Sequence, residues 1–155
     1  MPQPGLGLNG WVGWGPESTW GTLVSRTKYG ELAGAESMAL RTNPTKPRSW
    51  RGLTPRRVFE GKRFTEGDIP FELHYAGFEQ WLKQLFGAVN TSGPISSLYT
   101  HAFTLATALQ AGMSLEVCRD VPSGNSFLYE GCKVGALKFN GDIDQILMMT
   151  ASVIG

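Results

Sequence analysis

The stretch GDIPFELHYAGFEQWLKQLFG, residues 67–87, decides the fold because its apolar residues change period partway along. Over residues 67–75 apolar and polar side chains alternate, which is typical of a β-strand with one buried face. The apolar positions are Ile69, Phe71, Leu73 and Tyr75, and the positions between them are Asp68, Pro70, Glu72 and His74. The second face of this strand therefore carries two carboxylates, Asp68 and Glu72.

The second half of the same stretch has the spacing of an amphipathic α-helix. Its apolar residues fall at positions i, i+3, i+4, i+7 and i+8, and they are Phe78, Trp81, Leu82, Leu85 and Phe86. Gly87 stands where helices commonly end. We predict a helix at about residues 76–87 that lies on a sheet.

The rest of the chain is dominated by strand-type runs. Short strands are expected at 36–41 and 56–64, the second joined to the strand at 67–75 by a hairpin turn through Thr65, Glu66 and Gly67. After the turn-rich NTSGP at 90–94, further runs lie at 98–106, 113–121, 126–139 and 142–154. These runs predict an α+β domain, mainly antiparallel, with about seven or eight strands and one helix. The final strand runs almost to Gly155, so we expect it to leave an open sheet edge.

The first residues are rich in glycine and tryptophan. Gly5, Gly7 and Gly10 spell GxGxxG, but no strand precedes them and no helical spacing follows, so a nucleotide site is not predicted. We predict an extended N-terminal arm over residues 1–22 and a β domain over residues 23–155. The arm carries three large side chains that need a surface to bury against, Trp11, Trp14 and Trp20. That surface belongs either to another subunit or to the same chain.

Charge is distributed unevenly, although the net charge of the 155 residues is only +1. Residues 41–63 hold eight of the 14 basic side chains and one acid, Glu60. Three prolines within residues 42–57 predict a long basic loop there. A basic limb on an acidic body suits contact with nucleic acid, and it suits equally the docking of one copy's limb on the next copy's body.

No catalytic, metal or membrane motif stands out. The two histidines, His74 and His101, lie in strand-type runs, and Cys118 and Cys132 lack the close spacing of metal ligands. Asp142 and Asp144 form the best carboxylate pair, but two acids on one strand face are usually surface residues. No apolar run approaches the length of a membrane span, and no signal peptide is recognisable. We expect no enzymatic activity and no cofactor.

Four segments together resemble the major tail tube proteins of long-tailed bacteriophages and related gene-transfer particles. They are PESTWGT at 16–22, the strand and helix at 67–87, LYTHAF at 98–103 and FLYEGCKVGAL at 127–137. The resemblance covers nearly the whole chain in order and spacing. It implies a β-sandwich or split barrel flanked by a helix, assembled into stacked rings around a channel for DNA. Many proteins of this kind are about twice as long, so the chain is either a compact member with six copies per ring or the first half of a longer protein.

The resemblance also implies roles for particular residues. The arm and the basic loop would contact neighbouring subunits through Trp11, Trp14, Trp20, Arg48, Trp50, Arg51, Arg56 and Arg57. A channel for DNA is best lined by acidic residues, because a basic wall would retain the phosphates. The candidates are Asp68, Glu72, Asp142 and Asp144.

Partners would be further copies of the chain, tail terminator and tail-tip proteins, and, in the channel, the tape measure protein and genomic DNA without specific binding. We expect assembly in the host cytoplasm and a place in the virion tail. Two other functions stay open. One is a tail-tip or connector protein with the same fold, and the other is a nucleic-acid-binding module in which Trp50 stacks on a base between Arg48 and Arg51.

Overall fold

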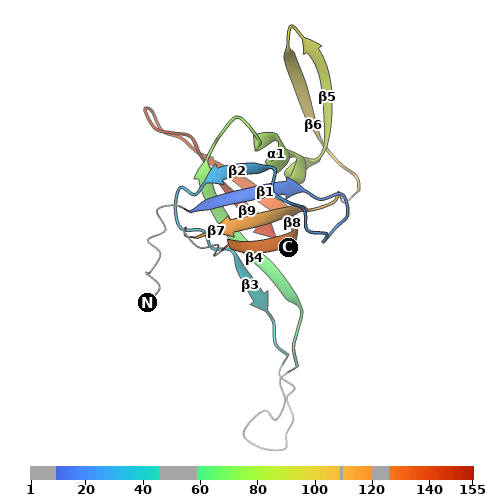
Figure 1. The fold of residues 1–155 in the computed structure, drawn as a ribbon, viewed down its shortest axis with the longest axis vertical. Coiled ribbons are helices and arrows are strands. Elements are labelled where there is room, and N and C mark those ends of the chain that lie inside the picture. The colour runs from blue at the N-terminus through green and yellow to red at the C-terminus, as the bar shows by residue number, and fades with distance from the viewer. Residues whose placement is uncertain (1–9, 46–58, 109, 120–125) are drawn as a thin grey trace, which may run out of the picture.

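The computed structural model describes residues 10–45, 59–108, 110–119 and 126–155. Within them lie nine strands and one helix (Figure 1). The elements are β1 Trp11–Pro16, β2 Lys28–Glu31, β3 Ala39–Thr42, β4 Arg63–Glu72, α1 Phe78–Phe86, β5 Gly87–Ile95, β6 Leu98–Leu105, β7 Met113–Cys118, β8 Ser126–Asn140 and β9 Met148–Ile154. No helix in this part of the chain is long and apolar enough to cross a membrane.

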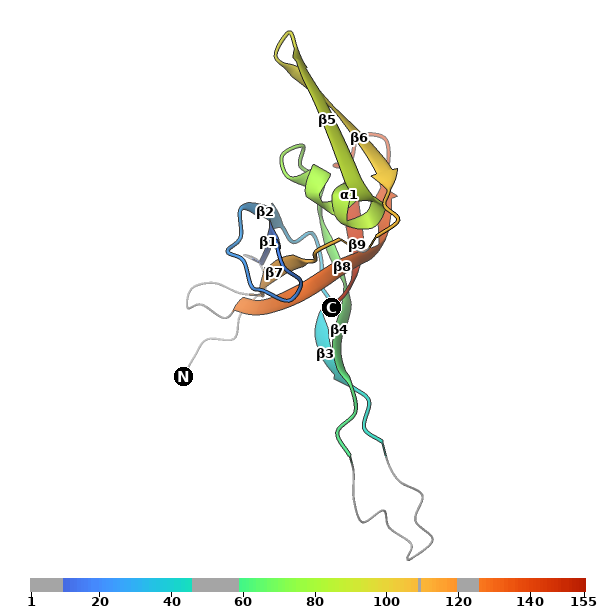
Figure 2. The same ribbon diagram turned by 90° about the vertical axis from the view of Figure 1, so that its right-hand side faces the viewer.

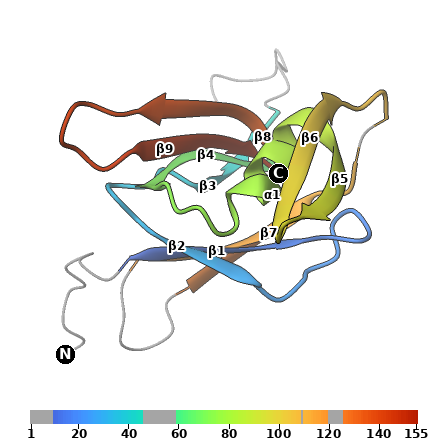
Figure 3. The same ribbon diagram turned by 90° about the horizontal axis from the view of Figure 1, so that it is seen from above.

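Seven strands form one antiparallel sheet in the order β2-β1-β7-β8-β9-β4-β3. Strand β8 is the longest, and its pairing shifts once against β7 and once against β9. Such irregularities bend a strand. The sheet consequently folds over at β8, so that β2, β1 and β7 face β9, β4 and β3 (Figure 3). This arrangement is the predicted α+β sandwich with one flanking helix.

The core lies between the two halves of the folded sheet. Alternate residues of four strands point into it and are buried, namely Val12 and Trp14, Ile69 and Phe71, Met113, Leu115 and Val117, and Met149, Ala151 and Val153. Helix α1 closes one end of the sandwich with Trp81, whose ring lies 5.2 Å from that of Trp14 and 5.0 Å from that of Phe71. The predicted alternation contributes to this core through Ile69 and Phe71, and the helical period contributes through Trp81. The strand expected at 67–75 ends at Glu72, however, and Tyr75, expected on its buried face, is fully exposed.

Helix α1 begins and ends at glycines with left-handed backbone conformations. Gly77 has a φ of 95° and Gly87 a φ of 92°, and the Gly87 N–H donates to the carbonyl of Lys83. This is the C-terminal cap expected from the sequence. The predicted helix is therefore confirmed, with bounds one to two residues inside the expected range.

The predicted hairpin turn at Thr65, Glu66 and Gly67 is wrong. Strand β4 runs straight through these residues and pairs with β3 on one side and β9 on the other. Gly67 is needed there for close approach, because a Cβ atom on it would lie 2.5 Å from backbone atoms of Met38. The hairpin is instead formed by β3 and β4, and its connection contains the basic loop.

Two other strand expectations are also wrong. Residues 90–94, expected to be a turn, belong to β5, and the turn follows at Ser96 and Ser97, which have positive φ angles. The final strand β9 is no sheet edge, because it lies between β8 and β4. The edges of this sheet are β2 and β3, each only four residues long, and short edge strands limit unwanted pairing.

Candidate assembly surfaces

The predicted N-terminal arm is wrong for residues 11–16, which form β1 inside the main sheet. Trp14 is 2% exposed and belongs to the core, so it cannot anchor on a neighbouring subunit. Its ring fills the space between Phe71 and Trp81. Of the two alternatives left open by the sequence, the intramolecular one holds for Trp14. Residues 1–9 lie outside the described residues.

Trp11 is partly exposed on the outer side of the sheet. Its ring meets Tyr29 edge to face at 5.7 Å, and the guanidinium of Arg26 lies 4.8 Å from the ring centre. Arg26 donates from Nε to the Tyr29 hydroxyl at 3.0 Å and forms an ion pair with Glu116. The hydrogen bonds to Tyr29 and Glu116 raise the pKa of Arg26. The Trp11 ring is thus held in place by contacts within its own chain, and part of the ring remains exposed to solvent.

Trp20 lies in the loop between β1 and β2 and is 48% exposed. The Lys133 ammonium is 5.7 Å from the centre of its ring, and that ammonium donates to the Gln84 side chain and the Ala111 carbonyl. Burial lowers the pKa of Lys133. The backbone of Gly131, with a φ of 66°, passes beneath the indole, where a Cβ atom would be 3.1 Å from Nε1.

A buried carboxylate, Glu17, fixes this loop, and no pattern in the sequence predicted it. Glu17 accepts hydrogen bonds at Oε1 from Ser114 Oγ and from the Gly131 N–H, and at Oε2 from the Gly21 N–H, all between 2.8 and 2.9 Å. Ser114 Oγ in turn accepts from the Val24 N–H at 3.0 Å. In the sequence, Glu17 stands between a proline and a serine after an apolar run. The same surroundings are typical of a surface acid, so they did not indicate a buried carboxylate.

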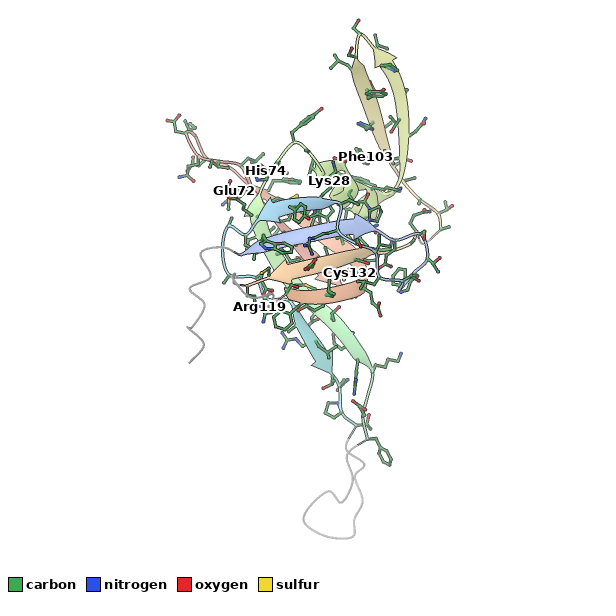
Figure 4. All side chains as sticks on the ribbon, in the orientation of Figure 1. Lys28, Glu72, His74, Phe103, Arg119 and Cys132 are labelled. Carbon is green, nitrogen blue, oxygen red and sulfur yellow. The ribbon has the colours of Figure 1, made fainter. Side chains whose placement is uncertain are left out.

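The candidate channel residues separate into two groups. Asp68 and Glu72 lie on β4 and point away from the core, opposite Ile69 and Phe71; Glu72 is labelled in Figure 4. Asp68 Oδ1 accepts a hydrogen bond of 2.6 Å from Ser152 Oγ on β9.

Asp142 and Asp144 do not share a strand face, so the premise for this pair is wrong. They lie in the turn between β8 and β9, where Asp144 has a φ of 66° and the Asp142 carboxylate accepts from the Ile143 N–H. Polar side chains favour this local bonding over a strand.

The predicted contact residues of the basic loop lie outside the described residues. They are Arg48, Trp50, Arg51, Arg56 and Arg57. The described parts on either side, up to Thr45 and from Phe59, are joined by hydrogen bonds between these two residues and lead away from the body below β3 and β4 (Figure 2). The described residues that flank the loop therefore form a projecting two-stranded arm, the β3–β4 arm.

A second projection, formed by β5 and β6, was not predicted as a surface. Its two strands pair only with each other and rise from α1 on the opposite side of the body from the β3–β4 arm (Figure 1). Residues 90–102 are all exposed. Among the described residues, no group of three or more histidine, cysteine or acidic side chains could hold a metal ion.

Comparison with known proteins agrees with this architecture. The sequence model of the family described as phage tail tube protein matches residues 7–155. None of the curated proteins matches significantly. A chain in the solved structure entitled "Virion of native gene transfer agent (GTA) particle" is similar in fold, with a TM-score of 0.51 and 8% sequence identity. The match covers 95% of this chain and 90% of that chain.

Proposed function

Because this chain belongs to the phage tail tube protein family and is a structural protein of the virion tail, we propose that its copies form rings that stack head to tail around a DNA channel. The observation that carries the proposal is the family match over nearly the whole chain. Six copies per ring suit a single sandwich domain. We also propose that the protein has no enzymatic activity.

The outward face of β3, β4, β9 and β8 is the proposed channel wall. Asp68 and Glu72 stand on it beside two short hydroxyl side chains of β9, Thr150 and Ser152, which pair with β4 in register. Small polar side chains keep such a wall smooth. The carboxylates repel phosphates, so DNA would slide without being held.

Some positive charge also lies on this face. Arg41 is 3.3 Å from Glu66 and is partly neutralised by it. Lys138 pairs in register with Thr150 and brings a further cation. With Asp68 and Glu72 on the same face, negative charge still exceeds positive charge.

The β3–β4 arm is the proposed stacking element. Basic side chains continue along its described base at Arg41, Lys62 and Arg63, although Arg63 pairs with Glu60. The turn with Asp142 and Asp144 extends from the other side of the body (Figure 1). A molecule with a basic arm and an acidic turn on opposite sides favours head-to-tail contacts, which generate filaments. We propose that Arg48, Arg51, Arg56 and Arg57 dock on the adjacent ring and not on DNA.

Electron microscopy of the purified protein tests the function. We expect rings or tubes with a continuous channel. Reversing the charges of Arg48, Arg51, Arg56 and Arg57 together should stop stacking while single rings and the thermal unfolding transition remain. Individual rim charges contribute about 1 kcal/mol or less, so one substitution is not expected to suffice.

Three results would contradict the proposal. A strictly monomeric protein at high concentration would exclude a tube, and salt-dependent DNA binding lost in the four-arginine variant would favour the nucleic-acid module. A copy number of one ring per particle would favour a connector or tail-tip protein over a tube.

A further inference from the structure

The β5–β6 hairpin is an amphipathic ribbon whose apolar face is covered only at its base by the described part of its own chain. Paired residues of an antiparallel ribbon share a face, and alternate residues take opposite faces. The pairs Val89 with Phe103 and Thr91 with His101 therefore share a face with Tyr99 and Leu105. The other face carries Ala88, Asn90, Ser92, Thr100, Ala102 and Thr104, and at its tip the pair Ile95 with Leu98. One face is thus aromatic and aliphatic along its length, and the other consists of small and mostly polar side chains except at the tip, where Ile95 and Leu98 are exposed.

The apolar face begins in the body and extends outward. Phe103, labelled in Figure 4, packs against Phe86 of α1 with ring centres 6.4 Å apart. Farther out, Thr91 and His101 form a side-chain hydrogen bond of 2.8 Å across the ribbon. Tyr99 near the tip is 59% exposed and Leu105 at the base is 80% exposed.

An isolated two-stranded ribbon is marginally stable in water, and exposed strand edges are usually protected by charged residues. This ribbon has no such protection, because residues 87–107 contain no aspartate, glutamate, lysine or arginine. The absence of charge also argues against an acidic or nucleic-acid partner. The hairpin is built to be covered by an uncharged protein surface.

The chain itself presents a groove with exposed apolar residues on its lining. This groove of about 460 Å³ is lined by residues of β2, β7 and β8 and by the β1–β2 loop that Glu17 and Ser114 hold. Its exposed apolar residues are Leu23, Tyr29 and Leu128. The charged pair in the groove, Arg26 with Glu116, is mutually neutralised. The hairpin projects away from the body, so the groove that it fills belongs to another molecule (Figure 1).

We propose that the apolar face of the β5–β6 hairpin docks in this groove on a second copy of the chain. The contact joins two different surfaces, so it can propagate from copy to copy. This inference rests on the proposed function in requiring self-assembly, but it concerns an interface separate from the β3–β4 arm. Tyr99 is the central side chain of the contact.

The test compares Tyr99→Lys with Thr100→Lys, which places the same charge on the opposite face of the same strand. Self-association of the two variants and the wild type is followed by sedimentation velocity over a range of concentrations. We expect Tyr99→Lys to raise the concentration needed for half-assembly by about tenfold or more, as loss of a buried aromatic anchor does. Thr100→Lys should assemble like the wild type, and both variants should keep the thermal unfolding midpoint.

Photo-crosslinking identifies the receiving surface. A benzophenone amino acid at position 99 should capture a second copy at residues that line the groove, and the same group at position 100 should not. Equal assembly of both lysine variants, or capture outside the groove, would overturn the proposal even if the wild type forms tubes. A wild type that never assembles would overturn both this proposal and the tube function. Vesicle binding that Tyr99→Lys abolishes while assembly is unchanged would show that the hairpin serves a lipid surface instead.

Discussion

Ser114 Oγ donates a 2.9 Å hydrogen bond to Glu17 Oε1 across a separation of 97 positions in the chain. The same carboxylate accepts from the backbone N–H groups of Gly21 and Gly131. Replacing Glu17 with alanine leaves the buried donors at Ser114 and Gly131 without their acceptor. We expect the free energy of unfolding to fall by at least about 2 kcal/mol, measured by urea denaturation, because each unsatisfied buried group costs about 1–3 kcal/mol. Glu130→Ala, at an exposed acid, is the control, and an equal loss in both variants would contradict this role.

Gly131 and Gly135 lie on the same strand but differ in backbone conformation. Gly131 has a φ of 66° and the Trp20 indole against it, whereas a Cβ atom on Gly135 would find its nearest neighbour at an ordinary 3.8 Å. We expect Gly131→Ala to reduce stability by about 1–3 kcal/mol because alanine is strained at such a φ. Gly135→Ala should stay within about 0.5 kcal/mol of the wild type. Thermal unfolding followed by circular dichroism distinguishes them, and similar midpoints would refute the strain at Gly131.

Truncation of Trp81 and truncation of Trp20 should affect stability to very different extents. Trp81 is fully buried against Trp14 and Phe71, so Trp81→Ala should cost about 3–5 kcal/mol and prevent assembly by unfolding the chain. Trp20→Ala should cost under about 1 kcal/mol and, if Trp20 contacts a neighbouring subunit, should weaken assembly of a folded protein. Denaturation curves and electron microscopy of the two variants provide the comparison. A folded Trp81→Ala variant that forms tubes would contradict the role of Trp81 in stabilising the core.

Cys132 should make stability depend on alkaline pH. Burial raises the pKa of its thiol to about 12, whereas in the unfolded chain the value is about 8.5. The unfolded state then loses its proton first, so the contribution of the neutral thiol is complete below about pH 8.5 and is lost as the pH rises toward 12. Between pH 8.5 and 10 we expect the free energy of unfolding to fall by up to about 1.4 kcal/mol per pH unit more in the wild type than in Cys132→Ala. Parallel pH profiles of the two proteins would contradict the buried thiol.

Asp68 and Glu72 provide the test of the channel wall. In the variant with both replaced by lysine we expect tubes to form, because neither side chain lies in the core, and DNA passage to slow through phosphate binding. The measurement is infectivity or gene transfer by particles containing the variant, together with salt-dependent retention of DNA by purified tubes. The control with the same charge change is Glu31→Lys with Glu130→Lys. Undiminished DNA delivery by the Asp68 and Glu72 variant would place these residues outside the channel.

Local patterns in the sequence were sufficient for several elements. The alternation up to Glu72, the helix at 78–86 and its cap at Gly87 follow from side-chain periods and from glycine's conformational freedom, which depend on near neighbours in the chain. The family resemblance followed from the order of such elements. The α+β class and the tail tube assignment were therefore accessible without coordinates.

Long-range pairing decided the rest. Trp14 belongs to the core and not to an arm because β1 pairs with β7, about a hundred residues later in the chain. Strand β9 lies inside the sheet because β4 pairs with its second edge. Glu17 looked like any surface acid until Ser114 and Gly131 converged on it. Burial and hydrogen bonding of this kind arise from contacts between distant segments, and periodicity within one segment carries no information about which distant partner will cover it.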